Sequence, residues 1–199
     1  MSGHTRDSTG GRMAMWLFIA TEVLLFGGLF LLYSMYRLKN PADFHAGSRE
    51  LSRLFGTLNT CILIISSYTV ALGIHYLIEG KKKTATAYIL STIGFAAGFL
   101  IVKTFEWSAK FEHGLYPKAA VLMAKPKGEI LFFGLYFMMT GLHAVHVIVG
   151  IGVLSVVAVM MRRGLVTADS PIVLENAGLY WHLVDIIWIF LFPLFYLIS

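Results

Sequence analysis

The run MAMWLFIATEVLLFGGLFLLYSMY, from Met13 to Tyr36, is 24 residues long and carries one charged side chain, Glu22. A helix of about 20 apolar residues is long enough to span the hydrocarbon core of a bilayer. The run is too long for the apolar part of a signal peptide, and no small-residue cleavage site follows it. We therefore expect a retained membrane-spanning helix over residues 13–36.

Four further apolar runs follow, separated by short polar segments. They cover residues 54–78, 84–102, 129–161 and 175–197. The predicted fold is all-α: an integral membrane bundle of five transmembrane helices, forming a single membrane domain over residues 1–199. Lys103 is expected to reach the membrane surface at the end of the third span. The segment from Glu106 to Gly128 is predicted to be the longest part outside the membrane.

Composition supports a membrane protein. The chain has 199 residues, of which 57% are hydrophobic, 14% aromatic and 14% charged, and its net charge is +5. Soluble domains are about 45–50% apolar and about 25% charged, so these values exclude a soluble domain and also a disordered chain. The basic residues lie between the apolar runs, as in membrane proteins, and predict no nucleic-acid partner. Their numbers on the two sides are too similar to fix the orientation. A single cysteine, Cys61, permits no internal disulfide.

Small residues within the spans predict close helix packing. Gly94 and Gly98 form a GxxxG pair, a spacing that lets two transmembrane helices approach closely. Further contact points are expected at Gly27, Gly28, Gly134, Gly141, Gly150 and Gly152.

Ionisable residues inside spans are informative because each costs roughly 2.5–3.5 kcal/mol near the membrane centre on insertion scales. They are Glu22, His75, His143, His146, His182 and Asp185. Phe18 and Phe26 flank Glu22 at helical spacing, so its carboxylate must face another helix. Two interpretations stay open: a functional carboxylate such as a proton carrier, or a structural acid hydrogen-bonded to a neighbouring helix.

The spacing of these residues predicts two polar faces. His143 and His146 are expected to share a face of the fourth span with Gly150. His182 and Asp185 are expected to form a hydrogen-bonded pair on the last span. At a rise of about 1.5 Å per residue, Glu22, His146, His182 and Asp185 fall in one half of the membrane and predict a polar layer there.

Histidines on separate spans also raise the possibility of a b-type haem, and therefore of a membrane electron carrier. The candidate ligands are His75, His143, His146 and His182. His143 and His146 are too close along one helix to be opposite ligands of a single haem. A metal site of carboxylates and imidazoles is disfavoured because no Glu-x-x-His spacing occurs. A further hypothesis is a transporter or channel component that uses Glu22 as a carrier.

Five strings resemble, in order, subunit III of the haem-copper oxidases. They are Met15–Glu22 with Phe26-Gly-Gly, Leu58–Leu63, Phe105-Glu106-Trp107 with Gly114–Pro117, Thr140–Val147 with Gly150, and Tyr180–Asp185 with Trp188–Leu191. The two histidine strings are the most specific, and the matches run from about Met13 to Tyr196. The chain is similar to the five-span form usual in bacterial oxidases, which lacks the first two helices of seven-span members.

The resemblance implies an accessory subunit in aerobic respiration that has no catalytic residue and is not an enzyme alone. Haem and copper would lie in partner subunits, and this chain would bind no metal but can hold phospholipid. It would pack on subunit I, in a complex with subunit II and other oxidase subunits, and support proton uptake and turnover stability. Glu22 would be the family's carbodiimide-reactive carboxylate.

The resemblance also implies a multi-pass protein of the bacterial plasma (inner) membrane with a cytoplasmic N-terminus. Glu at position 22, where quinol oxidases tend towards Asp, favours a proton-translocating cytochrome c oxidase. The alternative is subunit III of a quinol oxidase.

Overall fold

The computed structural model describes residues 3–198, with side chains from residue 10 onward, and this part of the chain is almost entirely helical. The elements are α1 (Gly3–Lys39), α2 (Pro41–Arg49), α3 (Arg53–Ile78), α4 (Lys82–Glu112), α5 (Ala120–Met123), α6 (Lys127–Arg163) and α7 (Ile172–Tyr196). Among the described residues, five helices are long and apolar enough to cross a membrane: α1, α3, α4, α6 and α7. The predicted all-α bundle of five spans is confirmed.

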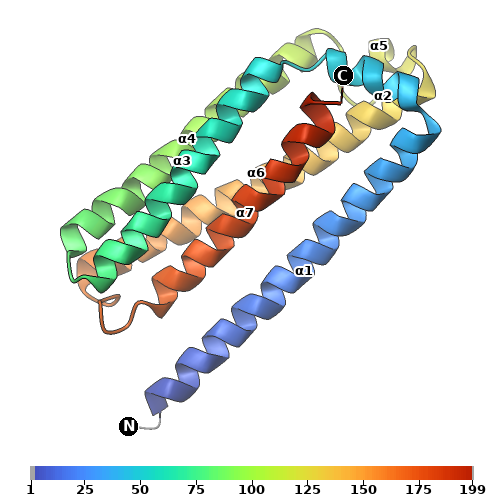
Figure 1. Cartoon of the computed structure of the whole chain (residues 1–199). Helices are drawn as coiled ribbons and strands as arrows, with labels where there is room; N and C mark the ends of the chain where they lie inside the picture. The colour runs from blue at the N-terminus through green and yellow to red at the C-terminus, as the bar shows by residue number, and fades with distance from the viewer. Residues whose placement is uncertain (1–2, 199) are drawn as a thin grey trace.

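Helix α7 lies at the centre of the bundle, and α1 lies at its edge (Figure 1). Helix α7 packs against α3, α6 and α1, whereas α1 packs against α6, α7 and the short α2. In α7, 56% of the most apolar stretch is buried inside the protein, whereas in α1 only 6% of that stretch is buried. The outer surface of α1 is therefore left for lipid or for another protein.

The two ends of the bundle differ in structure. The short helices α2 and α5 lie at the end that holds the C-terminus, and the α3–α4 and α6–α7 connections lie at the end where α1 begins (Figure 1). Gly80 and Gly164 have φ angles of 77° and 78°, in the left-handed region that favours glycine, and they terminate α3 and α6. The α3–α4 connection is a tight turn of three residues, whereas the α6–α7 connection is a longer loop.

Helix α4 is longer than the third apolar run. Lys103 and Glu106 lie inside it rather than after it, and their side chains are 2% and 1% exposed. The prediction that the Lys103 side chain reaches out to the membrane surface is therefore wrong, and the helix continues through Glu106, where the external segment was expected to begin. Opposite charges three residues apart pair with each other on one helix face, so the charges do not end the helix.

Among the glycines that bring helices together, Gly150 was predicted and Gly178 was not. A Cβ atom at Gly150 would lie 2.6 Å from the Trp181 ring, and one at Gly178 would lie 2.6 Å from Ile74. These clashes show that α6 approaches α7, and α7 approaches α3, only because a side chain is missing at each point.

Gly94 and Gly98 make no such contact. A Cβ atom at either position would meet nothing within 4 Å, so the predicted helix-packing role is wrong within the described chain. Their face of α4 points away from the other helices. The same open surroundings are found at Gly27, Gly28, Gly134 and Gly152, and Gly141 meets only Trp107, at 3.9 Å.

Candidate functional site

A carboxylate and an imidazole from two different spans meet inside the bundle. Oε2 of Glu22 on α1 lies 3.0 Å from Nε2 of His146 on α6, and the two side chains are only 14% and 13% exposed. The other ring nitrogen of His146, Nδ1, lies 2.8 Å from the carbonyl oxygen of Leu142. Glu22 thus faces another helix, as its position between Phe18 and Phe26 requires.

The partners of His146 restrict where protons can sit. Because a carbonyl oxygen only accepts, Nδ1 donates to Leu142. Nε2 then either donates to an ionised Glu22 or accepts from a protonated one. In both arrangements the pair has no net charge, which suits a low-dielectric membrane interior. The geometry of the contact thus allows one proton to be shared between the carboxyl group and the ring.

Helix α7 completes the surroundings of this pair. The hydroxyl of Tyr180 donates to the backbone oxygen of His146 at 2.9 Å, and the ring of Phe26 packs edge-on against the imidazole with centroids 5.4 Å apart. Nearer the start of α1, Arg12 makes a 3.0 Å ion pair with Glu175 of α7. The site is therefore built where α1, α6 and α7 meet.

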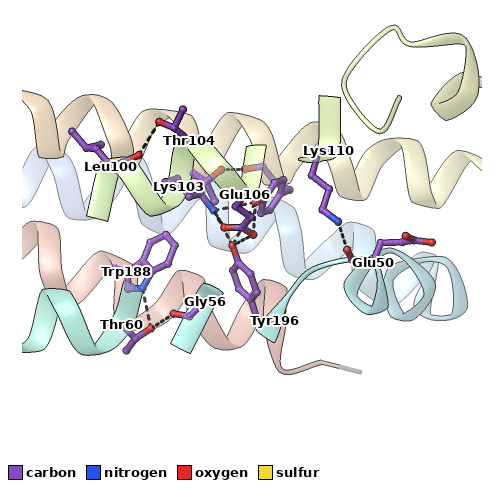
Figure 2. Close-up of polar contacts among 12 residues, drawn as sticks. Glu50, Gly56, Thr60, Leu100, Lys103, Thr104, Glu106, Lys110, Trp188 and Tyr196 are labelled. Carbon is purple, nitrogen blue, oxygen red and sulfur yellow. Dashed lines mark hydrogen bonds and ion pairs between the residues drawn. The ribbon is translucent and has the colours of Figure 1, made fainter. Parts of the chain in front are cut away.

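A second polar cluster lies deeper in the bundle, between α4, α6 and α7. Nζ of Lys103 lies 3.0 Å from Glu106, 3.0 Å from the hydroxyl of Tyr136 and 2.8 Å from that of Tyr196. The two tyrosines donate in turn to Oε1 of Glu106, at 2.9 and 2.6 Å. Figure 2 shows Lys103, Glu106 and Tyr196 converging, with Trp188 beside them.

Every hydrogen of the Lys103 ammonium and both oxygens of Glu106 have partners in this cluster. The ammonium also lies 5.2 Å from the centre of the Trp188 ring and 6.0 Å from that of Trp107, distances at which a cation is attracted to an aromatic face. A buried ion pair is stable only when its remaining hydrogen-bonding capacity is satisfied, as here. The cluster joins three spans and is structurally complete.

The sequence alone does not predict this cluster. It predicts Lys103 at the membrane surface and Glu106, with Trp107, in the segment after the third span. The spacing of three residues between Lys103 and Glu106 was the available signal, because a lysine and a glutamate at this spacing can neutralise each other inside a membrane. Nothing in the sequence around Tyr136 or Tyr196 indicates that these tyrosines contact Lys103.

His143 and His146 do not share surroundings. The ring of His143 is fully buried and packs against Phe99 and Trp188, with centroids 5.5 and 5.2 Å away, while His146 faces α1. Neither ring nitrogen of His143 has a hydrogen-bond partner among the described residues. Three residues turn a helix by about 300°, so the two rings diverge by roughly 60° and reach different neighbours.

His182 and Asp185 do not form the predicted pair. Nδ1 of His182 lies 2.7 Å from the hydroxyl of Ser67 on α3, and neither carboxylate oxygen of Asp185 has a hydrogen-bond partner among the described residues. Both residues line a groove of about 480 Å³ between α3 and α7. Of the predicted polar layer, only Glu22 and His146 are in contact.

The histidines proposed as haem ligands are dispersed. His75 lies near the end of α3 and pairs with Glu79 at 3.1 Å, and His143, His146 and His182 have the separate surroundings described above. Within the described residues, no group of three or more His, Cys, Asp or Glu side chains is arranged to hold a metal ion.

A five-span bundle with a partly buried carboxylate–imidazole pair defines a multi-pass membrane protein with an ionisable site among its helices. A family model described as cytochrome c oxidase subunit III matches residues 2–199. The chain therefore belongs to the cytochrome c oxidase subunit III family, which confirms the resemblance of the five strings.

Individual relatives agree with this assignment. The chain is 33% identical over 193 residues to a haem-copper oxidase subunit I+III of Aeropyrum pernix, covering 94% of this chain and 22% of that protein. It is 27% identical to a quinol oxidase subunit 3 of Bacillus subtilis, over 94% of this chain and 86% of the relative. A probable quinol oxidase subunit 3 of Staphylococcus haemolyticus is also 27% identical, over 100% and 94% of the two chains.

Proposed function

We propose that this chain is the accessory subunit III of a haem-copper terminal oxidase and that it packs directly on subunit I. The match to the family model over residues 2–199 carries the proposal. The Aeropyrum pernix relative supports the contact, because its name joins subunits I and III in one protein. Haem and copper are then bound by partner subunits, and this chain supplies no catalytic residue.

The Glu22–His146 pair gives this accessory role a physical basis. It holds a proton within the membrane and ties the edge helix α1 to α6 at 3.0 Å. We propose that Glu22 is the carbodiimide-reactive carboxylate and that the pair supports proton uptake and sustained turnover of the complex. The protein would lie in the bacterial plasma membrane with its N-terminus in the cytoplasm.

Deleting the gene in its host and restoring it on a plasmid tests this role. Oxidase lacking the chain is expected to start near the normal rate of oxygen consumption and to lose activity over fewer turnovers. The restored wild-type chain should recover the durability, and Glu22→Gln should recover only part of it. Unchanged durability without the chain would contradict the proposal.

The electron donor has two candidates. Glu at position 22 favours cytochrome c through the family resemblance, and the names of the Bacillus and Staphylococcus relatives favour quinol. Oxygen consumption by the purified complex, measured with reduced cytochrome c and separately with a reduced quinol, decides between them. We propose cytochrome c, and turnover with quinol alone would overturn that choice.

A further inference from the structure

A group of cations lies where α4 begins and α6 ends. Lys82 and Lys83 are in the first turn of α4, Arg162 is in the last turn of α6, and all three are exposed. Nζ of Lys82 donates to the backbone oxygen of Arg162 at 3.2 Å, so the two helix ends are in direct contact. The three residues form one basic cluster built from two spans.

No acidic side chain from residue 10 onward neutralises this cluster. Among the described residues, none of the three cations takes part in an ion pair. Glu79, the acidic residue in the adjoining α3–α4 turn, is held by Lys81 at 2.7 Å and by His75 at 3.1 Å. The contact with Lys81 lowers the pKa of Glu79, which keeps this carboxylate ionised and paired. The two lysines and the arginine of the cluster thus retain a local charge of about +3.

A groove of about 470 Å³ begins at the cluster and continues along the helices. The residues that line the groove are basic at one end and apolar at the other. They are Lys82, Lys83, Thr86, Ala87, Leu90 and Arg162. The cations stand at the end of the two spans, and Leu90 lies roughly 10–12 Å further along α4 at the rise of a helix. The groove is therefore basic at the membrane surface and apolar deeper in.

This gradient matches one class of ligand. An anionic phospholipid has a negative headgroup at the membrane surface and acyl chains below it, and basic pockets between transmembrane helices bind such headgroups. A free phosphate ion would use the cations but not the apolar surface at Leu90. We propose that this groove binds the headgroup of an anionic phospholipid in the leaflet on the side where α1 begins.

Native mass spectrometry of the purified full-length chain tests the proposal, with phosphatidylglycerol and phosphatidylcholine as probes. The wild type is expected to retain phosphatidylglycerol in preference to phosphatidylcholine. The triple variant Lys82→Gln, Lys83→Gln, Arg162→Gln should bind phosphatidylglycerol about a hundredfold more weakly, since each cation near an anionic headgroup contributes roughly a factor of five.

Two matched variants separate loss of the site from loss of the fold. Lys82→Arg, Lys83→Arg, Arg162→Lys keeps every charge and should retain the lipid. Lys39→Gln, Arg53→Gln, Lys127→Gln removes the same number and kinds of exposed cations at the other end of the bundle and should also retain it.

Several results would overturn the proposal. One is equal retention of phosphatidylglycerol by the wild type and the Gln triple variant, and another is equal retention of the two lipids by the wild type. Displacement of the lipid by millimolar inorganic phosphate would assign the cluster to a free anion instead. Loss of the lipid from the charge-conserving variant would also contradict an electrostatic headgroup site.

Discussion

Oε2 of Glu22 and Nε2 of His146 are 3.0 Å apart, and the two residues belong to α1 and α6. Helix α1 buries little of its apolar surface against the other helices, so polar contacts have an unusual share in positioning it. Inside a membrane, apolar side chains gain little by leaving lipid, whereas a buried polar group gains a partner it otherwise lacks. The pair therefore helps to position α1, in addition to its proposed role in holding a proton.

Replacing Glu22 by Gln separates these two roles. The side-chain amide that the substitution introduces can still hydrogen-bond to His146, so the free energy of unfolding should change by less than about 1 kcal/mol. The variant has no carboxyl group at this position, so labelling there by a hydrophobic carbodiimide, measured by peptide mass spectrometry, should disappear. Labelling that remains at the same position would refute the assignment of Glu22.

Removing the imidazole leaves the carboxyl group without its partner. His146→Leu should lower the free energy of unfolding by about 1–3 kcal/mol, the usual cost of an unsatisfied buried polar group. In the double variant Glu22→Leu, His146→Leu, the loss should be smaller than the sum of the two single losses. Strictly additive losses in detergent unfolding would show that the two side chains are not coupled.

Substitutions in the Lys103 cluster should destabilise the chain more than substitutions in the Glu22–His146 pair. Lys103→Met leaves the buried carboxyl group of Glu106 without its ammonium partner, and breaking a buried ion pair in this way costs about 3–5 kcal/mol. We expect a loss of this size in the free energy of unfolding of the full chain. Lys127→Met, at an exposed position with no ion pair among the described residues, is the control and should have little effect.

The double variant Lys103→Met, Glu106→Leu removes both charges together. Because no lone charge is then left inside the bundle, it should be more stable than Lys103→Met alone. A double variant less stable than either single one would mean that the cluster acts through its tyrosines rather than through the ion pair.

Removing the carboxyl group of Asp185 should not destabilise the chain, because this group, unlike that of Glu22, has no hydrogen-bond partner in the described chain. The buried oxygens of Asp185 therefore carry a desolvation cost without a compensating hydrogen bond. Asp185→Leu is expected to leave the isolated chain equally stable, or to stabilise it by about 1 kcal/mol. A loss of more than about 1 kcal/mol on thermal unfolding would show that Asp185 has a stabilising partner.

The glycine contacts give a matched pair of substitutions. Gly150→Ala places a methyl group 2.6 Å from Trp181 and should destabilise the chain by about 1–3 kcal/mol, the usual cost of overpacking. Gly94→Ala meets open space and should be neutral or slightly stabilising, because alanine favours the helix. Equal effects of the two on the melting temperature would contradict the described packing of α6 on α7.

The five spans could be predicted because a membrane requires long apolar segments, and these are visible in a single sequence. The importance of Glu22 could also be predicted, since an acid among apolar neighbours must face another helix. The partner of Glu22 could not be predicted, because His146, His182 and Asp185 are all expected at a similar depth in the membrane. The rotation of each helix about its axis decides among them, and the apolar pattern of a membrane helix barely records that rotation.

The Lys103 cluster was missed for a related reason. Charged residues usually mark the end of a span, so the sequence predicts Lys103 at the membrane surface and Glu106 outside the membrane. Their mutual neutralisation and the two tyrosine hydroxyls, which come from α6 and α7, let α4 continue to Glu112. Tyr136 and Tyr196 lie far from Lys103 in the chain, so only the folded structure brings them together.

This chain belongs to the subunit III family of the haem-copper oxidases, and we propose that it works as a subunit of such an oxidase and binds no haem itself. The most direct measurement is purification of the tagged chain from its host membranes, with mass spectrometry and an optical spectrum of the complex and of the separated chain. We expect a larger haem-copper subunit I in the complex, a haem spectrum from the complex, and no haem absorption from the separated chain. A haem band that stays with the separated chain, or a complex without subunit I, would contradict the claim.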